Sequence, residues 1–217
     1  TDGKGVAGTR MVYLGPHRET TRTVGDHRVT LVVPEAADLE PSREELFSSL
    51  DAAAETLRVG NAPPQILIVA APTSVDWGPN GLTDRPDAWV RADQSLETPS
   101  NVWLHEYVHL RQDFTTTTDA RWTIEAMGEY YAAYLSLEQG LVGFEAFQRH
   151  LDEGEDERYD GSVLTEPGTW APLADYVKGG LVFGNLDRRM RLATDGRNPA
   201  TDLFRTMNRK DGPVSHE

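Results

Sequence analysis

The sequence predicts an α+β fold, in which a β-rich lobe over residues 1–98 precedes a helical lobe over residues 99–217 of one domain. Two observations support this order. The first half contains apolar runs of strand length bounded by proline, such as Q-I-L-I-V-A at 65–70. The second half, from Thr98 onward, contains longer segments with helix-start and helix-stop signals. A chain of 217 residues is long enough for two lobes with a cleft between them.

The first half combines several short strands with one helix. Ser42 followed by Glu45 is a capping box that opens this helix, and its apolar spacing continues to Gly60. Residues 73–87 are rich in Gly, Pro and Asp and are predicted to form a loop. A polar, hairpin-like stretch separates the first two strands. The predicted strands are 10–14, 28–33, 65–70 and 88–91, the last of them as an edge strand.

The second half is predicted to be helical. Thr98-Pro99 opens a helix, because Pro is favoured in the first helical turn. Asp119 is expected to cap a second helix that ends at Gly140. Further helices are expected near 143–151, 171–193 and 199–208. The acidic run at 151–160 reads as a solvated loop, and a Ca²⁺ site is the alternative because carboxylates are calcium ligands.

The charge of the chain is unusual. There are 35 Asp and Glu residues against 21 Lys and Arg residues, which gives a formal net charge of -14. A surface of this sign repels phosphate, so neither nucleic acid nor an anionic membrane is expected as a partner. The composition resembles that of proteins from salt-loving organisms, in which screening removes the repulsion among carboxylates. An ordinary acidic protein is the alternative.

The chain has no cysteine, so any zinc must be held by His and carboxylate side chains. No apolar run in the sequence approaches the length of a membrane span. The chain begins at Thr1 rather than at Met, which suggests a processed protein or an excised domain. We expect a location outside the cell or at its surface.

Residues 105–109 read His-Glu-Tyr-Val-His. On a helix, His105 and His109 are four residues apart and project from one face with the spacing that a single Zn²⁺ requires. Glu106 lies beside that face, where it can take a proton from a zinc-activated water. A chance match is the alternative, so the prediction depends on a third ligand elsewhere in the chain.

Candidates for the third ligand lie in W-T-I-E-A-M-G-E-Y-Y, where Glu125 and Glu129 share one helix face. If this helix packs against the histidines, one carboxylate can bind zinc while the other accepts a hydrogen bond from a ligand histidine. We prefer Glu125 as ligand and Glu129 as its supporting carboxylate, and the reverse assignment stays open. The alternative is that both are surface carboxylates, but acids among aromatic residues need a partner.

These residues resemble the gluzincin metallopeptidases, and among them the glycyl aminopeptidase and alanyl aminopeptidase families. There, the H-E-x-x-H motif is followed by W-x-x-E-G-x-x-x-Y-Y, whose Glu is the third zinc ligand. This chain has Trp122, Glu125 and Tyr130-Tyr131 at the matching positions, with Ala126 in place of Gly. The resemblance implies a thermolysin-like zincin fold, with the active site in the cleft between the lobes. It selects Glu125 as the ligand.

The resemblance extends in both directions along the chain. In thermolysin-like relatives, a carboxylate four residues after the ligand supports a zinc histidine, which is the position of Glu129. A Tyr-x-Lys-Gly stretch in these families supplies the tyrosine that stabilises the oxyanion, and it matches Tyr176 here. In these families, a Gly-rich segment with an acid that reads a substrate amine leads into the edge strand that binds substrate. Residues 78–84, which lead into Trp89-Val90, correspond to that segment, with Thr83 in place of the acid. Asp84 is the alternative acid.

The remaining histidines and a group of arginines are predicted to have no part in the zinc site. No histidine among them has a partner at ligand spacing, so each is predicted to be a surface or loop residue. The arginines are expected to form ion pairs with the acidic surface, although a contact with a substrate carboxylate is the alternative. The histidines are His17, His27, His150 and His216, and the arginines are Arg188, Arg189 and Arg191.

The sequence therefore predicts a zinc peptidase that acts on peptide or protein substrates. His105, His109 and Glu125 would bind one Zn²⁺, Glu106 would act as general base, and Tyr176 would stabilise the oxyanion. A zincin-like module that binds peptides or serves assembly without catalysis is the main alternative, and a zinc hydrolase with another substrate is the second. The sequence does not distinguish an endopeptidase from an aminopeptidase.

Overall fold

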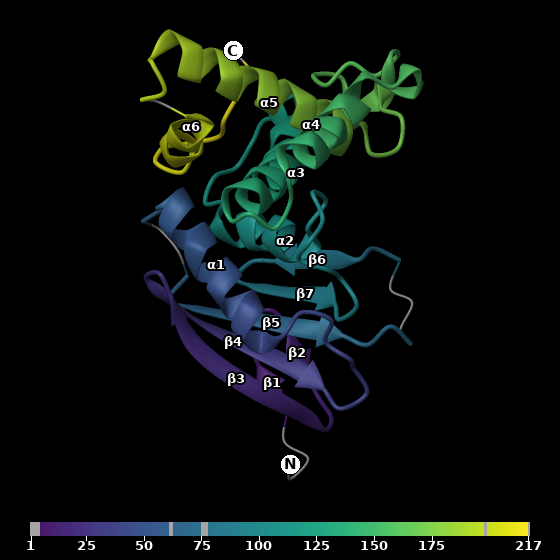
Figure 1. Cartoon of the computed structure of the whole chain (residues 1–217), viewed down its shortest axis with the longest axis vertical. Helices are drawn as coiled ribbons and strands as arrows, with labels where there is room; N and C mark the ends of the chain where they lie inside the picture. The colour runs from purple at the N-terminus through teal and green to yellow at the C-terminus, as the bar shows by residue number, and fades with distance from the viewer. Residues whose placement is uncertain (1–4, 61–62, 75–77, 198, 217) are drawn as a thin grey trace.

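The computed structural model describes residues 5–60, 63–74, 78–197 and 199–216, and it confirms a mixed α+β fold. Figure 1 shows the strands at one end of the molecule and the helices of the second half of the chain at the other end. The strands are β1 (Val6–Ala7), β2 (Val12–Tyr13), β3 (His17–Val24), β4 (His27–Pro34), β5 (Gln65–Ala71), β6 (Gly81–Asp84) and β7 (Asp87–Arg91). The helices are α1 (Arg43–Leu57), α2 (Val102–Arg111), α3 (Trp122–Glu138), α4 (Phe144–Asp152), α5 (Ala174–Ala193) and α6 (Ala200–Met207).

Five strands form the main sheet, in the order β3-β4-β5-β7-β6. The inner pairs β4/β5 and β5/β7 are parallel, whereas β3/β4 and β6/β7 are antiparallel. The chain crosses from β4 to β5 through α1, which lies across one face of the sheet in Figure 1. The β1–β2 hairpin packs on a second apolar cluster of the sheet, which contains Val32, Val69 and Trp89.

Two strand predictions were wrong, for different reasons. The stretch at 17–24 was predicted to be a polar connection, but it is β3, paired along its whole length with β4. Its exposed polar side chains conceal the pattern because it is an edge strand. The segment at 88–91 was predicted to be an edge strand, but β7 lies between β5 and β6. The edge is β6, which falls within the predicted loop at 73–87 and lies beside α2.

The helix starts also differ from the prediction. Asn101, rather than Thr98-Pro99, caps α2, because its side chain accepts a hydrogen bond from the backbone N–H of Leu104. Asp119 lies in a short 3₁₀ turn before α3 and does not cap that helix. The capping box of α1 is confirmed, with the Ser42 and Glu45 side chains each bonded to the other's backbone. No helix in the described part of the chain is long and apolar enough to cross a membrane.

A buried polar cluster around Tyr107 and Arg111 holds α2 in place. The hydroxyl of Tyr107 lies 3.1 Å from Nε2 of His27, and Arg111 contacts Nδ1 of the same ring at 2.6 Å. Arg111 also donates to Asp26. The prediction that His27 is a surface or loop histidine is therefore wrong: it is 2% exposed. Burial, opposed in part by Asp26, lowers the pKa of His27 and favours a neutral ring.

Helices α3 and α5 cross at very close range. A Cβ atom added to Gly179 would lie 2.5 Å from Cβ of Ala126 and 3.5 Å from a ring carbon of Trp122. One of the two helices must therefore carry glycine at this crossing. Here Gly179 supplies that glycine, at the position of the glycine in the Tyr-x-Lys-Gly stretch, and Ala126 stands where the resembled families have a second glycine.

This arrangement predicts that the glycine can be exchanged between the two helices. Gly179→Ala alone should lower the free energy of unfolding by about 1–3 kcal/mol, because the new methyl group overpacks the crossing. Ala126→Gly alone should cost about 1 kcal/mol through backbone entropy. The double variant should recover most of the loss, with a coupling energy of about 1–3 kcal/mol in urea unfolding of all four proteins. Additive losses would contradict the close crossing.

Candidate metal centre

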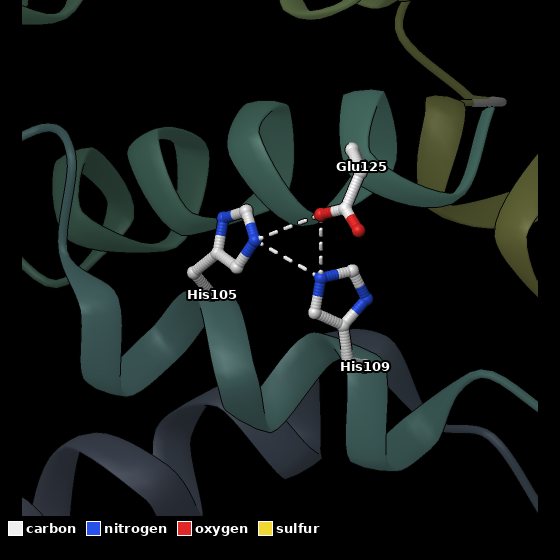
Figure 2. Close-up of side chains that lie close together, drawn as sticks. All are labelled: His105, His109 and Glu125. Carbon is white, nitrogen blue, oxygen red and sulfur yellow. Dashed lines mark hydrogen bonds and ion pairs between the residues drawn. The ribbon is translucent and has the colours of Figure 1, made fainter. Parts of the chain in front are cut away.

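Helix α2 presents three polar side chains to the interior between the sheet and α3. His105 is 8% exposed and Glu106 is 7% exposed, although neither is an apolar residue. Figure 2 shows the rings of His105 and His109 projecting from α2 towards Glu125 on α3. The spacing of four residues places the two rings on the same side of the helix, as the sequence predicts.

Three ligand atoms converge between these helices. Nε2 of His105 lies 2.9 Å from Nε2 of His109, and Oε2 of Glu125 lies 3.4 Å and 3.0 Å from these two nitrogens. Tetrahedral zinc with bonds of about 2.0–2.1 Å requires its ligands to be about 3.3 Å apart. In the described residues, this is the one group of three or more His, Cys, Asp or Glu side chains whose ligand atoms converge in this way. The donor set and its spacing fit zinc.

The outer nitrogens of both rings have oxygen partners. Nδ1 of His105 lies 3.3 Å from Oε2 of Glu129. Nδ1 of His109 lies 2.9 Å from Oε1 of Gln112, whose own Nε2 donates to the carbonyl of Ile124. With a proton on each Nδ1, both Nε2 lone pairs face the space beside Glu125. Glu129 is on the outer side of His105, so this geometry favours Glu125 as the ligand.

The electrostatics of the cluster attract a cation. Burial opposes charge on all of these groups, but mutual contacts outweigh it. Contacts with Glu125 and Glu129 raise the pKa of His105 to about 10, and contacts with His105 and His150 lower the pKa of Glu129 to about 2. The pKa of Glu125 is likewise lowered by the two histidines. The carboxylates are therefore ionised at neutral pH and stabilise positive charge on or between the rings.

Glu106 is held apart from the three converging atoms. The hydroxyl of Thr83 on β6 donates to Oε2 of Glu106 at 2.7 Å and lies 3.2 Å from its backbone carbonyl. A Cβ atom at Gly81 would lie 2.7 Å from Oε1 of the same carboxylate. The sequence indicated Thr83 only as the replacement of an acid, and its contact with Glu106 was not foreseen. The edge strand thus positions the carboxylate.

Tyr176 lies in the first turn of α5, against the same cluster. Its ring stacks on the ring of His105, with centroids 5.5 Å apart and planes 7° apart. Burial and the negative charge of Glu125 raise the pKa of its phenol, so that it stays protonated near neutral pH. Tyr176 is therefore a hydrogen-bond donor at the edge of the metal centre.

An open cleft of about 340 Å³ connects these groups. Its walls come from the edge strand β6, the polar face of α2, the start of α3 and the first turn of α5. Its lining is Gly81, Leu82, Thr83, Asp84, Arg85, His105, Glu106, His109, Gln112, Phe114, Ile124, Glu125 and Tyr176. Asp84, the alternative to Thr83 as a reader of a substrate amine, is exposed at this cleft.

The sequence matches no family profile and no curated protein. Solved structures do match. An aminopeptidase N family protein from Idiomarina loihiensis has a TM-score of 0.69 at 17% identity, over 90% of this chain and 41% of its own. A mutant M1 zinc metallopeptidase from Deinococcus radiodurans, bound to a Tyr-Ser-Ala substrate, has a TM-score of 0.67 at 14% identity, over 94% and 47%. The fold is that of an M1 peptidase domain.

A third match with this M1 fold is leukotriene A4 hydrolase from Saccharomyces cerevisiae, with a TM-score of 0.55 at 13% identity. It covers 94% of this chain and 34% of the hydrolase. The chain thus spans less than half the length of all three of these structures. The M1 fold is shared by proteins with different substrates, so the chemistry has to be argued from the site.

Two of the other predicted surface histidines are not at the surface. His150 on α4 has a side chain that is 10% exposed, with Nε2 2.8 Å from Oε1 of Glu129. His17, which begins β3, is 8% exposed and contacts the carbonyl of Gly15. Local spacing gave no sign of these contacts, because the partner of His150 lies on another helix. His216 is exposed, as predicted.

Among the described residues, one of the three arginines shows the predicted kind of ion pair, and its partner Asp187 is buried rather than on the surface. Arg191 pairs with Asp187 at 2.7 Å and donates to the hydroxyl of Tyr134. Arg188 and Arg189 are exposed. Residues 151–160 end α4 and form short turns, and in the described residues they do not form a group of converging ligands. The alternative of a Ca²⁺ site there has no support from the geometry.

Proposed function

We propose that this chain is a zinc-dependent peptidase, with the metal held by His105, His109 and Glu125. The observation that carries the proposal is the convergence of two Nε2 atoms and one Oε2 atom within 3.4 Å at the wall of an open cleft. An independent carboxylate, Glu106, lines the same cleft. The M1 fold of the structural neighbours supports the same reaction class, and the proposal includes a thermolysin-like arrangement of the two lobes.

The remaining residues have defined parts in peptide hydrolysis. Zinc, when bound, supplies a Lewis acid that lowers the pKa of water and polarises a carbonyl. Glu106 accepts the proton of the attacking water and transfers it to the leaving amine, while Thr83 holds its carboxylate in place. The phenol of Tyr176 donates a hydrogen bond to the carbonyl oxygen as negative charge develops. Glu129 and Gln112 fix the orientation of the two rings.

The substrate is proposed to be a peptide or protein. The edge strand β6 borders the cleft and can pair with an extended backbone. One of the structural neighbours is bound to a tripeptide, which is consistent with this class of substrate.

The test combines metal analysis with peptide cleavage. Wild-type protein, Glu125→Ala and Glu129→Ala are loaded with zinc in high-salt buffer, analysed for bound metal and incubated with a peptide library. We expect one zinc per chain in the wild type, its loss in Glu125→Ala, and weakened retention in Glu129→Ala. Cleavage should follow the zinc content. Wild-type protein that binds no zinc at saturating metal would refute the proposal, and zinc with peptide binding but no cleavage would indicate a binding module.

A further inference from the structure

Three side chains with little exposure, from three helices, form a line that leads away from the proposed metal centre. Nδ1 of His105 on α2 lies 3.3 Å from Oε2 of Glu129 on α3, and the other oxygen of Glu129 lies 2.8 Å from Nε2 of His150 on α4. The side chains of His105, Glu129 and His150 are 10%, 13% and 10% exposed. The carboxylate therefore links two histidines that are 45 positions apart in the sequence.

We infer that His150 is a positioning residue of the metal centre. It holds Glu129 in the orientation in which one oxygen of this carboxylate lies 3.3 Å from Nδ1 of His105. The inference rests on the proposed function, because His105 is a ligand only if the site binds metal. It adds a residue that neither the H-E-x-x-H spacing nor the downstream Glu motif includes.

The argument starts from the requirements of a buried carboxylate. An ionised carboxylate with little access to water is stabilised by a partner on each oxygen, since an unpaired buried charge is strongly destabilising. His105 can satisfy only one oxygen of Glu129, because its second nitrogen faces Glu125 and His109. On the α5 side, even a Cβ atom added to Gly180 would meet only carbon atoms of Glu129, at 3.5 Å and 3.8 Å. Nε2 of His150, 2.8 Å from the other oxygen, supplies the second partner as an ion pair.

The consequence for the metal centre follows from the same geometry. Without His150, one oxygen of Glu129 loses its ion-pair partner among the described residues, so the carboxylate gains from rotating towards water. This rotation removes the partner that fixes the ring of His105 and keeps its Nε2 basic. Loss of such outer partners typically weakens metal binding by about 10- to 100-fold.

Glu153 provides an internal comparison. It lies 3.8 Å from the outer nitrogen of His150, and its side chain is 55% exposed. An exposed pair at this distance contributes little. The inference therefore assigns the positioning role to His150 itself rather than to a relay that extends to the surface.

The experiment measures zinc affinity by competition with a chromogenic chelator, and separately measures urea unfolding of the metal-free proteins. The variants are His150→Leu, His150→Gln, Glu129→Gln, the double variant Glu129→Gln with His150→Leu, and Glu153→Gln as control. We expect His150→Leu to weaken zinc binding by about 10- to 100-fold. His150→Gln keeps an N–H near the position of Nε2 and should recover most of the affinity. Glu153→Gln should match the wild type.

The double variant shows whether His150 acts through Glu129. If it does, His150→Leu weakens zinc binding no further once Glu129 is already Gln. An equal loss in both backgrounds would overturn the inference, as would wild-type affinity in a folded His150→Leu protein. If His150→Leu does not fold, the same cycle is made with His150→Ala, which also lacks the ring nitrogen. Wild-type protein without zinc would refute the proposed function, whereas these outcomes refute only the role of His150.

Discussion

Glu106→Gln should bind zinc as the wild-type protein does, but cleave peptides about 100- to 10,000-fold more slowly, the range that general acid–base catalysis typically contributes. The amide has nearly the same shape as the carboxylate, so the site should keep its structure. Its oxygen can still accept the hydrogen bond that Thr83 now donates to Glu106 at 2.7 Å. What it cannot do is accept a proton from water at neutral pH. The measurements are zinc stoichiometry and single-turnover cleavage at saturating zinc.

Glu138→Gln is the matched control for this change. Glu138 is an exposed residue in the last turn of α3, far along the same helix from Glu125, and it does not line the cleft. It makes the same exchange of carboxylate for amide without touching the proposed chemistry, so its cleavage rate should equal that of the wild type. If zinc-loaded Glu106→Gln cleaves within about tenfold of the wild-type rate, which is below the range for a general base, Glu106 does not act as one.

Predictions based on local sequence were the most successful. The capping box at Ser42 and Glu45 appears with both of its hydrogen bonds, because all of its atoms lie within one helical turn. The spacing of His105 and His109 places both rings on one face, because helical geometry alone fixes that relation. The apolar run at 65–70 became the central strand β5, because a strand covered on both faces has no polar side to conceal its pattern.

Predictions that depended on tertiary contacts were less successful. His27 and His150 were predicted to be ordinary histidines, since their partners Arg111 and Glu129 lie on helices far along the chain. The strand β3 was not predicted, because an edge strand needs few apolar residues.

In the proposed metal centre, too, relations within one helix could be predicted, and contacts between elements could not. The proposed ligand His109 could be predicted from its spacing, whereas the contacts of Thr83 and Gln112 could not. Thr83 reaches Glu106 from the edge strand, across 23 positions of sequence. Gln112 is three residues after His109, but its amide is oriented by the carbonyl of Ile124 on another helix. Helical periodicity does not report such contacts between elements.

Gly128→Ala should disrupt the metal centre although it replaces glycine in the middle of a helix. By helix propensity alone, this change should stabilise α3 by about 0.5–1 kcal/mol. The added Cβ, however, would lie 2.8 Å from Cε1 of His105, 2.9 Å from its Nε2 and 3.1 Å from Cε1 of His109. Neither ring can withdraw easily, since Glu129 and Gln112 hold their outer nitrogens.

The steric effect should therefore outweigh the gain in helix propensity at Gly128. The gain should be visible at a helix glycine that does not face the two rings. We expect Gly128→Ala to lose at least about 100-fold in zinc affinity, the upper end of the loss seen when ligand support is removed, and to lose cleavage with it. Gly180→Ala on α5 is the control, because its Cβ would meet Glu129 only at an ordinary 3.5 Å. This variant should keep its zinc and gain about 0.5–1 kcal/mol in urea unfolding. Wild-type zinc affinity in Gly128→Ala would show that the helices adjust at this point, and that the close approach of α3 to the two rings is not needed for the ligand geometry.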